Sequence, residues 1–160
     1  MKRADKYKDT PYFHFYNANS HNHYSGDCAI RAICTALNQS WEETLTEMFK
    51  IGLKYGYEPT DCHVIDRYLK EKGWVKCKQP RNEDNTKMSI KKFIDKLYHP
   101  IYCEELPLPS DGIELGRIIC NAGSHHIVAV VSGQVYDIWN SSNETCGNFW
   151  VKEHDNNNKS

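Results

Sequence analysis

A cysteine at the start of a predicted helix is the residue of this sequence best suited to nucleophilic chemistry. Ser25, Gly26 and Asp27 are turn and helix-capping residues, and the apolar residues after them recur at helical spacing up to Leu37. Cys28 therefore lies in the first helical turn, where the partial positive charge of the helix N-terminus favours the thiolate. The unpaired backbone N–H groups of that turn can bind an oxyanion. The alternative is that Cys28 is a small buried hydrophobic residue.

Two histidines and an aspartate near the C-terminus supply a candidate base and a group to orient it. His125 and His126 precede the apolar run of a predicted central strand, and Asp137 lies in the next strand. With a hairpin turn at 132–133, His126 becomes a diagonal neighbour of Asp137. A carboxylate there fixes the tautomer of His126 and leaves its other nitrogen for a thiol. A one-residue slip of register would put His125 in this place, so His125 stays open as the base.

The predicted elements are mostly helices first and strands later. Ser40 and Glu43 form a capping box that begins the second helix, and Gly73 ends the third. After Gly116 the apolar period changes to that of strands. This order predicts an α+β fold with an antiparallel sheet. Helices are expected at 27–37, 40–55, 60–72 and 89–99, and strands at 11–16, 74–78, 117–120, 127–131, 135–139 and 149–152.

Length and composition limit the class of protein. The 160 residues are 39% hydrophobic and predict one domain at 25–153, with an N-terminal arm at 1–24 and a disordered Asn-rich tail at 154–160. The net charge of -1 argues against nucleic acid as a partner, and the apolar runs are too short to span a membrane. Seven cysteines without a C-x-x-C pair favour a reducing cytosol. The charged N-terminus has no apolar segment behind it, so we expect no signal peptide and a cytoplasmic location.

The order of the candidate residues resembles the papain-like cysteine peptidase superfamily, over most of the chain from Gly26 to Trp150. Gly-Asp-Cys28 followed by Ala-Ile-Arg-Ala-Ile is similar to compact bacterial and phage members, including the bacteriocin-processing peptidase domains with their Asp-Cys pair. His126-Ile-Val-Ala-Val followed by Val-Tyr-Asp137 is similar to the second half of these proteins. The resemblance implies a papain-like fold, in which a central helix carrying the nucleophile packs on an antiparallel sheet carrying His and Asp.

One position departs from the pattern of this superfamily. Papain-like enzymes usually have a Gln six residues before the Cys as an oxyanion-hole donor, and that position here is Asn22. Its amide offers the same donor on a shorter arm, so Asn22 is the expected donor, with Asn19 and the Cys28 backbone N–H as alternatives. Asn140 is an alternative to Asp137 as the orienting group, since an Asn fills that role in papain.

These residues predict a cysteine peptidase or amidohydrolase that cleaves an amide or isopeptide bond of a protein or peptide through a thioester, without metal or cofactor. The same triad supports acyl transfer of the transglutaminase or deamidase type. A different class is a catalytically inactive binding module, such as a phage or bacterial protein that engages a host protein, and the missing Gln favours it. A third class is a small zinc protein that uses Cys62, His63 and other Cys or His residues, although the spacing of these residues matches that of zinc ligands only weakly. Cys62, at the start of the third predicted helix, is also a rival to Cys28 as the reactive thiol.

Overall fold

The computed structural model describes residues 1–24, 26–98 and 113–153. The predicted loop at 104–112 and the predicted tail at 154–160 lie outside these residues. None of the described helices is long and apolar enough to cross a membrane. The elements are α1 (Arg3–Lys6), β1 (Phe13–Phe15), α2 (Cys28–Leu37), α3 (Trp41–Tyr55), α4 (Cys62–Glu71), β2 (Trp74–Cys77), α5 (Ile90–Tyr98), β3 (Ile113–Ala122), β4 (His126–Val131), β5 (Gln134–Asp137) and β6 (Cys146–Glu153).

The strands form one six-stranded sheet in the order β1-β5-β4-β3-β6-β2. All neighbours are antiparallel except β1 and β5, which are parallel, with Phe13 beside Val135. The predicted α+β class is therefore confirmed, and the prediction of an antiparallel sheet is wrong at this edge. The N-terminal arm supplies the parallel strand, because burying Phe13, which has no exposed surface, draws the arm along the open edge of β5.

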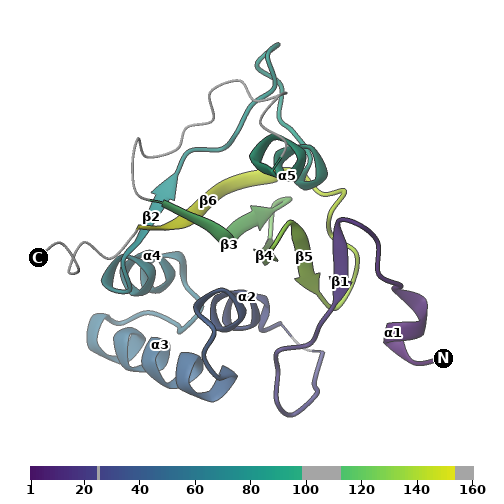
Figure 1. The fold of residues 1–160 in the computed structure, drawn as a ribbon. Helices are drawn as coiled ribbons and strands as arrows, with labels where there is room; N and C mark the ends of the chain where they lie inside the picture. Colours follow the sequence, from purple (N-terminus) through teal and green to yellow (C-terminus); the bar gives the residue numbers. More distant parts are fainter. Residues whose placement is uncertain (25, 99–112, 154–160) are drawn as a thin grey trace, which may run out of the picture.

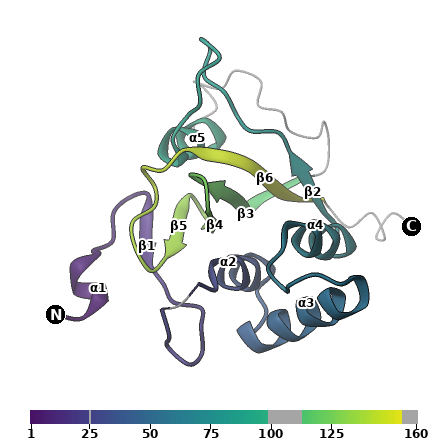
Figure 2. The same cartoon turned by 180° about the vertical axis from the view of Figure 1, so that it is seen from behind.

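The two faces of the sheet carry separate apolar cores, because successive residues of a strand point to opposite sides. On one face Ile118 and Val128 pack with α5. On the other face Ile119 and Ala129 pack with α2 and α4. Figure 1 shows α5 on one side of the sheet and α2, α3 and α4 on the other, and Figure 2 shows the same layers from behind. The candidate nucleophile belongs to the three-helix layer.

Helix α2 lies between the sheet and α3. Seven of its ten residues are buried, so packing holds the helix on nearly every side and fixes the position of its first residue, Cys28. The helix ends at Asn38, whose left-handed backbone closes it with hydrogen bonds to the carbonyls of Cys34 and Thr35. At the other end, the Ile127 backbone N–H contacts the Cys28 sulfur. The N-terminus of α2 therefore lies against the first residues of β4.

Helix α3 begins as predicted and buries only part of its apolar surface. The Ser40 side chain accepts a 3.0 Å hydrogen bond from the Glu43 backbone N–H at its start. Met48 is fully buried, whereas Phe49 is 49% exposed and Leu53 is 70% exposed. Figure 2 shows why: α3 lies outside α2 and α4, so neighbours cover only one stripe of its surface.

Candidate active site

The β4–β5 hairpin fixes the distance between His126 and Asp137. Ser132 and Gly133 both have positive φ, 49° and 83°, as a two-residue type I′ turn requires. The turn pairs Val130 with Val135, so His126 lies diagonally across from Asp137, as predicted. The ring nitrogen Nε2 of His126 lies 2.6 Å from Oδ2 of Asp137. The hydrogen bond predicted between these two residues is therefore present.

The Asp137 carboxylate is almost fully buried and has four partners. Oδ2 also accepts from the Ser141 hydroxyl at 2.7 Å. Oδ1 accepts from the Ile138 backbone N–H at 2.7 Å and from Nη1 of Arg31 at 3.1 Å. Burial works against the charged form. The hydrogen bond and charge of His126, with the hydrogen bonds from Ser141 and the Ile138 N–H, nevertheless hold the Asp137 pKa below its usual value. Asp137 is therefore an ionised group in a buried place.

The Cys28 thiol lies beside the His126 ring, and each group shifts the pKa of the other. Burial opposes thiolate formation, but the hydrogen bond and charge of His126, the Ile127 N–H and the charge of Arg31 together lower the Cys28 pKa. By contrast, burial raises the pKa of Cys34 to about 11. Cys28 is thus set apart from an ordinary buried thiol by its partners.

His126 lies between the thiol and the carboxylate. Its Nε2 faces Asp137, so Nδ1 is the nitrogen open to Cys28. Burial disfavours the charged ring, yet the hydrogen bonds and charges of Asp137 and Cys28 raise the His126 pKa to about 9. The Trp139 ring packs on the imidazole with centroids 5.1 Å apart. The lowered pKa of Cys28 and the raised pKa of His126 both shift the pair toward a thiolate beside an imidazolium.

Arg31 and Ser141 are two polar contacts of the site that the sequence analysis did not identify. Arg31 is 8% exposed and Ser141 is fully buried. The signal for Arg31 was present, because a cation on the apolar face of a helix needs a buried partner. Asp27, four residues earlier, is a good partner by spacing, and its Oδ1 accepts from Arg31 Nε at 2.9 Å.

A cavity of about 450 Å³ opens beside Cys28 and His126. One side of it carries an ion pair, with Lys76 Nζ 3.2 Å from the Asp66 carboxylate. The remaining wall is a mixture of small, polar and aromatic residues: Gly26, Ala29, Thr60, Cys62, Ile65, Asn121, Ser124, His125, Ile127 and Trp150. A groove of this kind has room for an extended segment of substrate at the thiol.

The other predicted site residues lie further from the thiol or are engaged elsewhere. Asn22 is exposed, adopts a left-handed conformation, and is not among the residues that line the cavity. Asn19 is buried, and its Nδ2 donates to Asp27 at 3.0 Å. Asn140 accepts from the backbone N–H and hydroxyl of Ser142 and so stabilises a turn. His125 is exposed and lines the cavity, but of these two histidines it is His126 that contacts Asp137.

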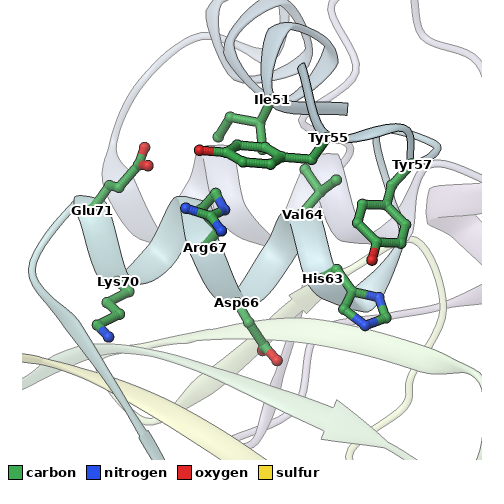
Figure 3. A pocket seen from close by; sticks show the side chains of 9 residues that line it. All are labelled: Ile51, Tyr55, Tyr57, His63, Val64, Asp66, Arg67, Lys70 and Glu71. Carbon is green, nitrogen blue, oxygen red and sulfur yellow. The ribbon is translucent and has the colours of Figure 1, made fainter. Parts of the chain in front are cut away.

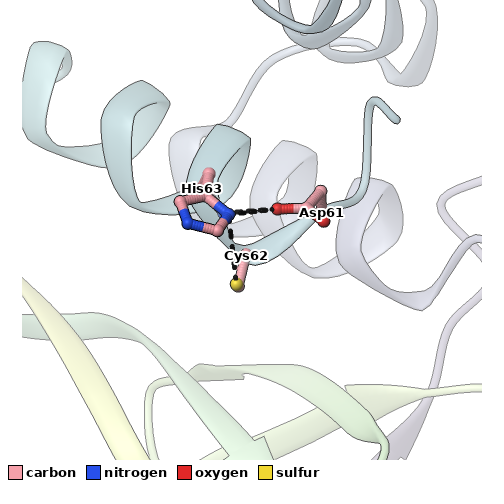
Figure 4. Close-up of side chains that lie close together, drawn as sticks. All are labelled: Asp61, Cys62 and His63. Atoms are coloured by element: carbon pink, nitrogen blue, oxygen red, sulfur yellow. Dashed lines mark hydrogen bonds and ion pairs between the residues drawn. The ribbon is translucent and has the colours of Figure 1, made fainter. Parts of the chain in front are cut away.

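A second Cys–His–Asp cluster lies at the N-terminus of α4 (Figure 4). Nδ1 of His63 is 2.7 Å from Asp61 Oδ1 and 3.8 Å from the Cys62 sulfur. One nitrogen thus meets both partners, so His63 cannot pass a proton from a thiol on one side to a carboxylate on the other. The three donor atoms lie within 4.8 Å of one another, as at a metal site. The helix N-terminus, however, repels cations, and Asp61 already accepts from the backbone N–H and ring of His63.

A second cavity, of about 630 Å³, lies between α3 and α4 (Figure 3). Arg67 lies 3.9 Å from the centre of the Tyr55 ring, and Tyr57 stacks on His63. These contacts occupy the aromatic faces that a ligand would use. No cysteine lines this cavity, so the thiol chemistry belongs to the groove at Cys28.

Comparison with protein-family models, curated proteins and solved structures finds no match to this chain. The papain-like assignment therefore stays a prediction, and the geometry of Cys28, His126 and Asp137 is the basis for the function proposed below.

Proposed function

We propose that this protein is a papain-like thiol hydrolase that cleaves an amide or isopeptide bond of a peptide or protein. The observation that carries the proposal is the position of His126, which lies beside the Cys28 thiol and presents Nε2 to the buried carboxylate of Asp137. A base held between a nucleophile and an orienting carboxylate is the arrangement that nucleophilic acyl transfer needs. The Cys28 residue acts as nucleophile, His126 as acid and base, and Asp137 as the orienting group.

The first half of the reaction forms a thioester. The Cys28 thiolate attacks the carbonyl carbon, and the C=O electron pair moves to oxygen. The backbone N–H groups in the first turn of α2, where no side chain caps the helix, supply donors for that oxyanion. The His126 imidazolium then gives its proton to the leaving nitrogen as the C–N bond breaks.

The second half returns the enzyme to its starting state. His126, now neutral, takes a proton from water as the water oxygen attacks the thioester carbon. The tetrahedral intermediate collapses, the C–S bond breaks, and the product leaves as a carboxylic acid with the thiolate–imidazolium pair restored. Asp137 stays ionised throughout and stabilises the charged ring at the steps where His126 holds two protons.

Iodoacetamide labelling of each cysteine, followed by mass spectrometry across a pH series, tests the proposal without a known substrate. Cys28 should label fastest at neutral pH, and His126→Ala should abolish that advantage. Cys62 is an internal reference in the same sample, because it is exposed and the single His63 nitrogen that it meets is also the one that contacts Asp61. If Cys28 labels no faster than Cys62, the chain has no activated nucleophile.

Two other outcomes identify the alternative functions. A reactive Cys28 whose thioester is resolved by an added amine in preference to water identifies an acyl transferase. An unreactive Cys28 in a folded protein favours a binding module, and the position of Asn22 outside the lining of the groove is the observation on its side. Capture of the acyl-enzyme with activated ester substrates, with and without amine, separates hydrolysis from transfer.

A further inference from the structure

A chain of alternating buried charges links the candidate triad to the N-terminus of α2. Arg31 donates through Nε to Asp27 at 2.9 Å and through Nη1 to Asp137 at 3.1 Å. The exposed fractions of the three side chains are 9%, 13% and 2%. The guanidinium therefore bridges two carboxylates, one directly before the nucleophile and one on the orienting residue.

Asp27 is itself fixed from two further directions. Its Oδ2 accepts from Asn19 in the N-terminal arm and from the indole N–H of Trp41 in α3, both at 3.0 Å. The arm, α2 and α3 thus meet at one carboxylate. Because that carboxylate holds Nε of Arg31, the direction of the guanidinium is set by three elements at once.

A buried arginine is costly unless it has partners, so its position here calls for a reason beyond packing. The Asp137 carboxylate already accepts from His126, Ser141 and the Ile138 N–H. What Arg31 adds is a permanent positive charge on the side of Asp137 away from His126, since Arg cannot lose its proton in a protein. Arg31 also contributes to lowering the pKa of Cys28.

We propose, building on the proposed function, that Arg31 is a positioning residue that keeps Asp137 charged and directed at His126, with Asp27 as the anchor of its guanidinium. The Gly-Asp-Cys-Ala-Ile-Arg segment then carries two functional residues in one helical turn. These are the nucleophile, Cys28, and the cation that keeps Asp137 charged, Arg31. Loss of Arg31 would then weaken the hold of Asp137 on His126. It would also remove a positive charge that lowers the pKa of Cys28.

Other charged or titratable groups lie around Cys28 and His126, and the test must leave them unchanged. His125, Cys62, Asp66 and Lys76 line the groove beside Cys28. Two more groups lie on neighbouring elements: Arg3 of α1, which donates to the Ile138 carbonyl, and Cys34 of α2. The variants below leave all of these unchanged.

The test is the pH profile of Cys28 labelling in Arg31→Gln, Arg31→Lys and Asp27→Asn. Arg31→Gln should move the half-maximal pH upward by about one unit, since a cation near the thiolate and the carboxylate is lost. Arg31→Lys, which keeps the charge, should move it by less than half as much. Asp27→Asn should move it downward, because an Asn keeps an oxygen that accepts from Nε of Arg31 while a negative charge near Cys28 is removed. Arg31→Gln and Asp27→Asn should thus shift the half-maximal pH in opposite directions, which a general loosening of the fold would not produce.

Arg117→Gln is the matched control. Arg117 also contacts α2, through the Thr35 carbonyl at the opposite end of the helix, and it has no contact with the triad. Its labelling profile should coincide with that of the wild type even if its unfolding midpoint falls. If Arg31→Gln does not fold, Arg31→Lys and Asp27→Asn carry the test by the size and sign of their shifts.

The outcomes separate this inference from the proposed function. A wild-type Cys28 without rapid labelling ends both. Rapid labelling that depends on His126, with profiles of the Arg31 and Asp27 variants that coincide with the wild type, ends only the role of Arg31. A downward shift in Arg31→Gln, or an upward shift in Asp27→Asn, also overturns the inference.

Discussion

The described part of the chain holds two clusters, each of one cysteine, one histidine and one aspartate, and they differ in how they are built. Cys28, His126 and Asp137 come from one helix and two strands, whereas residues 61–63 are consecutive. The Asp137 side chain is 2% exposed and that of His126 is 17% exposed. The corresponding values for Asp61 and His63 are 36% and 63%.

The comparison teaches that residue types near one another do not make a relay. In the 61–63 cluster a single ring nitrogen serves both neighbours, because side chains at adjacent helix positions approach one another from the same side. In the triad the sheet holds the Asp137 carboxylate on Nε2 of His126, and α2 brings the thiol to the same ring. Burial then strengthens each interaction, because water no longer screens the charges. The predictions below test that difference, starting from the largest expected effect.

Removal of the carboxylate should affect stability in the buried cluster only. Asp137→Ala leaves Arg31 and His126 without their shared buried partner, and breaking such a network costs about 3–5 kcal/mol of unfolding free energy. Asp61→Ala removes an exposed helix cap and should lower the denaturation midpoint only slightly. Chemical denaturation followed by circular dichroism measures both. Equal losses would mean that burial does not distinguish the two aspartates.

Removal of the histidine should affect the thiol in the buried cluster only. His126→Ala should slow Cys28 labelling at neutral pH by about 100-fold, because a thiol without a partner is only a few per cent ionised there and burial lowers that fraction further. His63→Ala should change Cys62 labelling by less than about threefold, the range of ordinary local effects on an exposed thiol. Mass spectrometry of both peptides from one sample gives the two ratios together. A large effect at Cys62 would show that proximity alone activates a thiol.

The charge of His126 should persist to unusually high pH. Its pKa is raised to about 9 by Asp137 and Cys28, so the ring stays protonated as pH rises through the usual histidine range near 6.5 and loses its proton near 9. Asp137→Asn removes the partner that contributes most to that rise and should lower the midpoint. NMR titration of the ring resonances measures it in both proteins. A wild-type midpoint near that of a free histidine would contradict the ion pair.

The smallest effect is expected from the aromatic cover of the imidazole. Trp139→Leu removes a ring packed 5.1 Å from His126 and keeps an apolar side chain there. Because aromatic pairs contribute about 0.5–1.5 kcal/mol beyond area burial, Cys28 labelling should change by roughly threefold to tenfold. Tyr57→Leu, which removes the ring stacked on His63, is the matched change at the other cluster and should leave Cys62 labelling within twofold or so. An effect at Trp139 as large as that of His126→Ala would mean that Trp139 holds the ring in place.

Local signals in the sequence were enough for the elements and for the pair on the hairpin. Ser40 and Glu43 predicted the start of α3, and the Ser132–Gly133 turn predicted the register that brings His126 to Asp137. These predictions succeeded because caps, turns and strand pairing across a short hairpin depend on residues close together in the chain. They failed where a distant segment intervened: β1 joins β5 in parallel, which nothing near residues 134–137 indicates.

The sequence by itself determined the candidate nucleophile at a helix start, the candidate base and its acidic partner, and the α+β class. Only the tertiary structure decided that His126 lies against both Cys28 and Asp137, that Asn22 lies away from the groove, and that Arg31 joins Asp27 to the triad. The physical reason is that ionisation depends on burial and on partners more than a hundred residues away. Helical and strand periods show which face of an element is covered, but they do not show which charge lies opposite it.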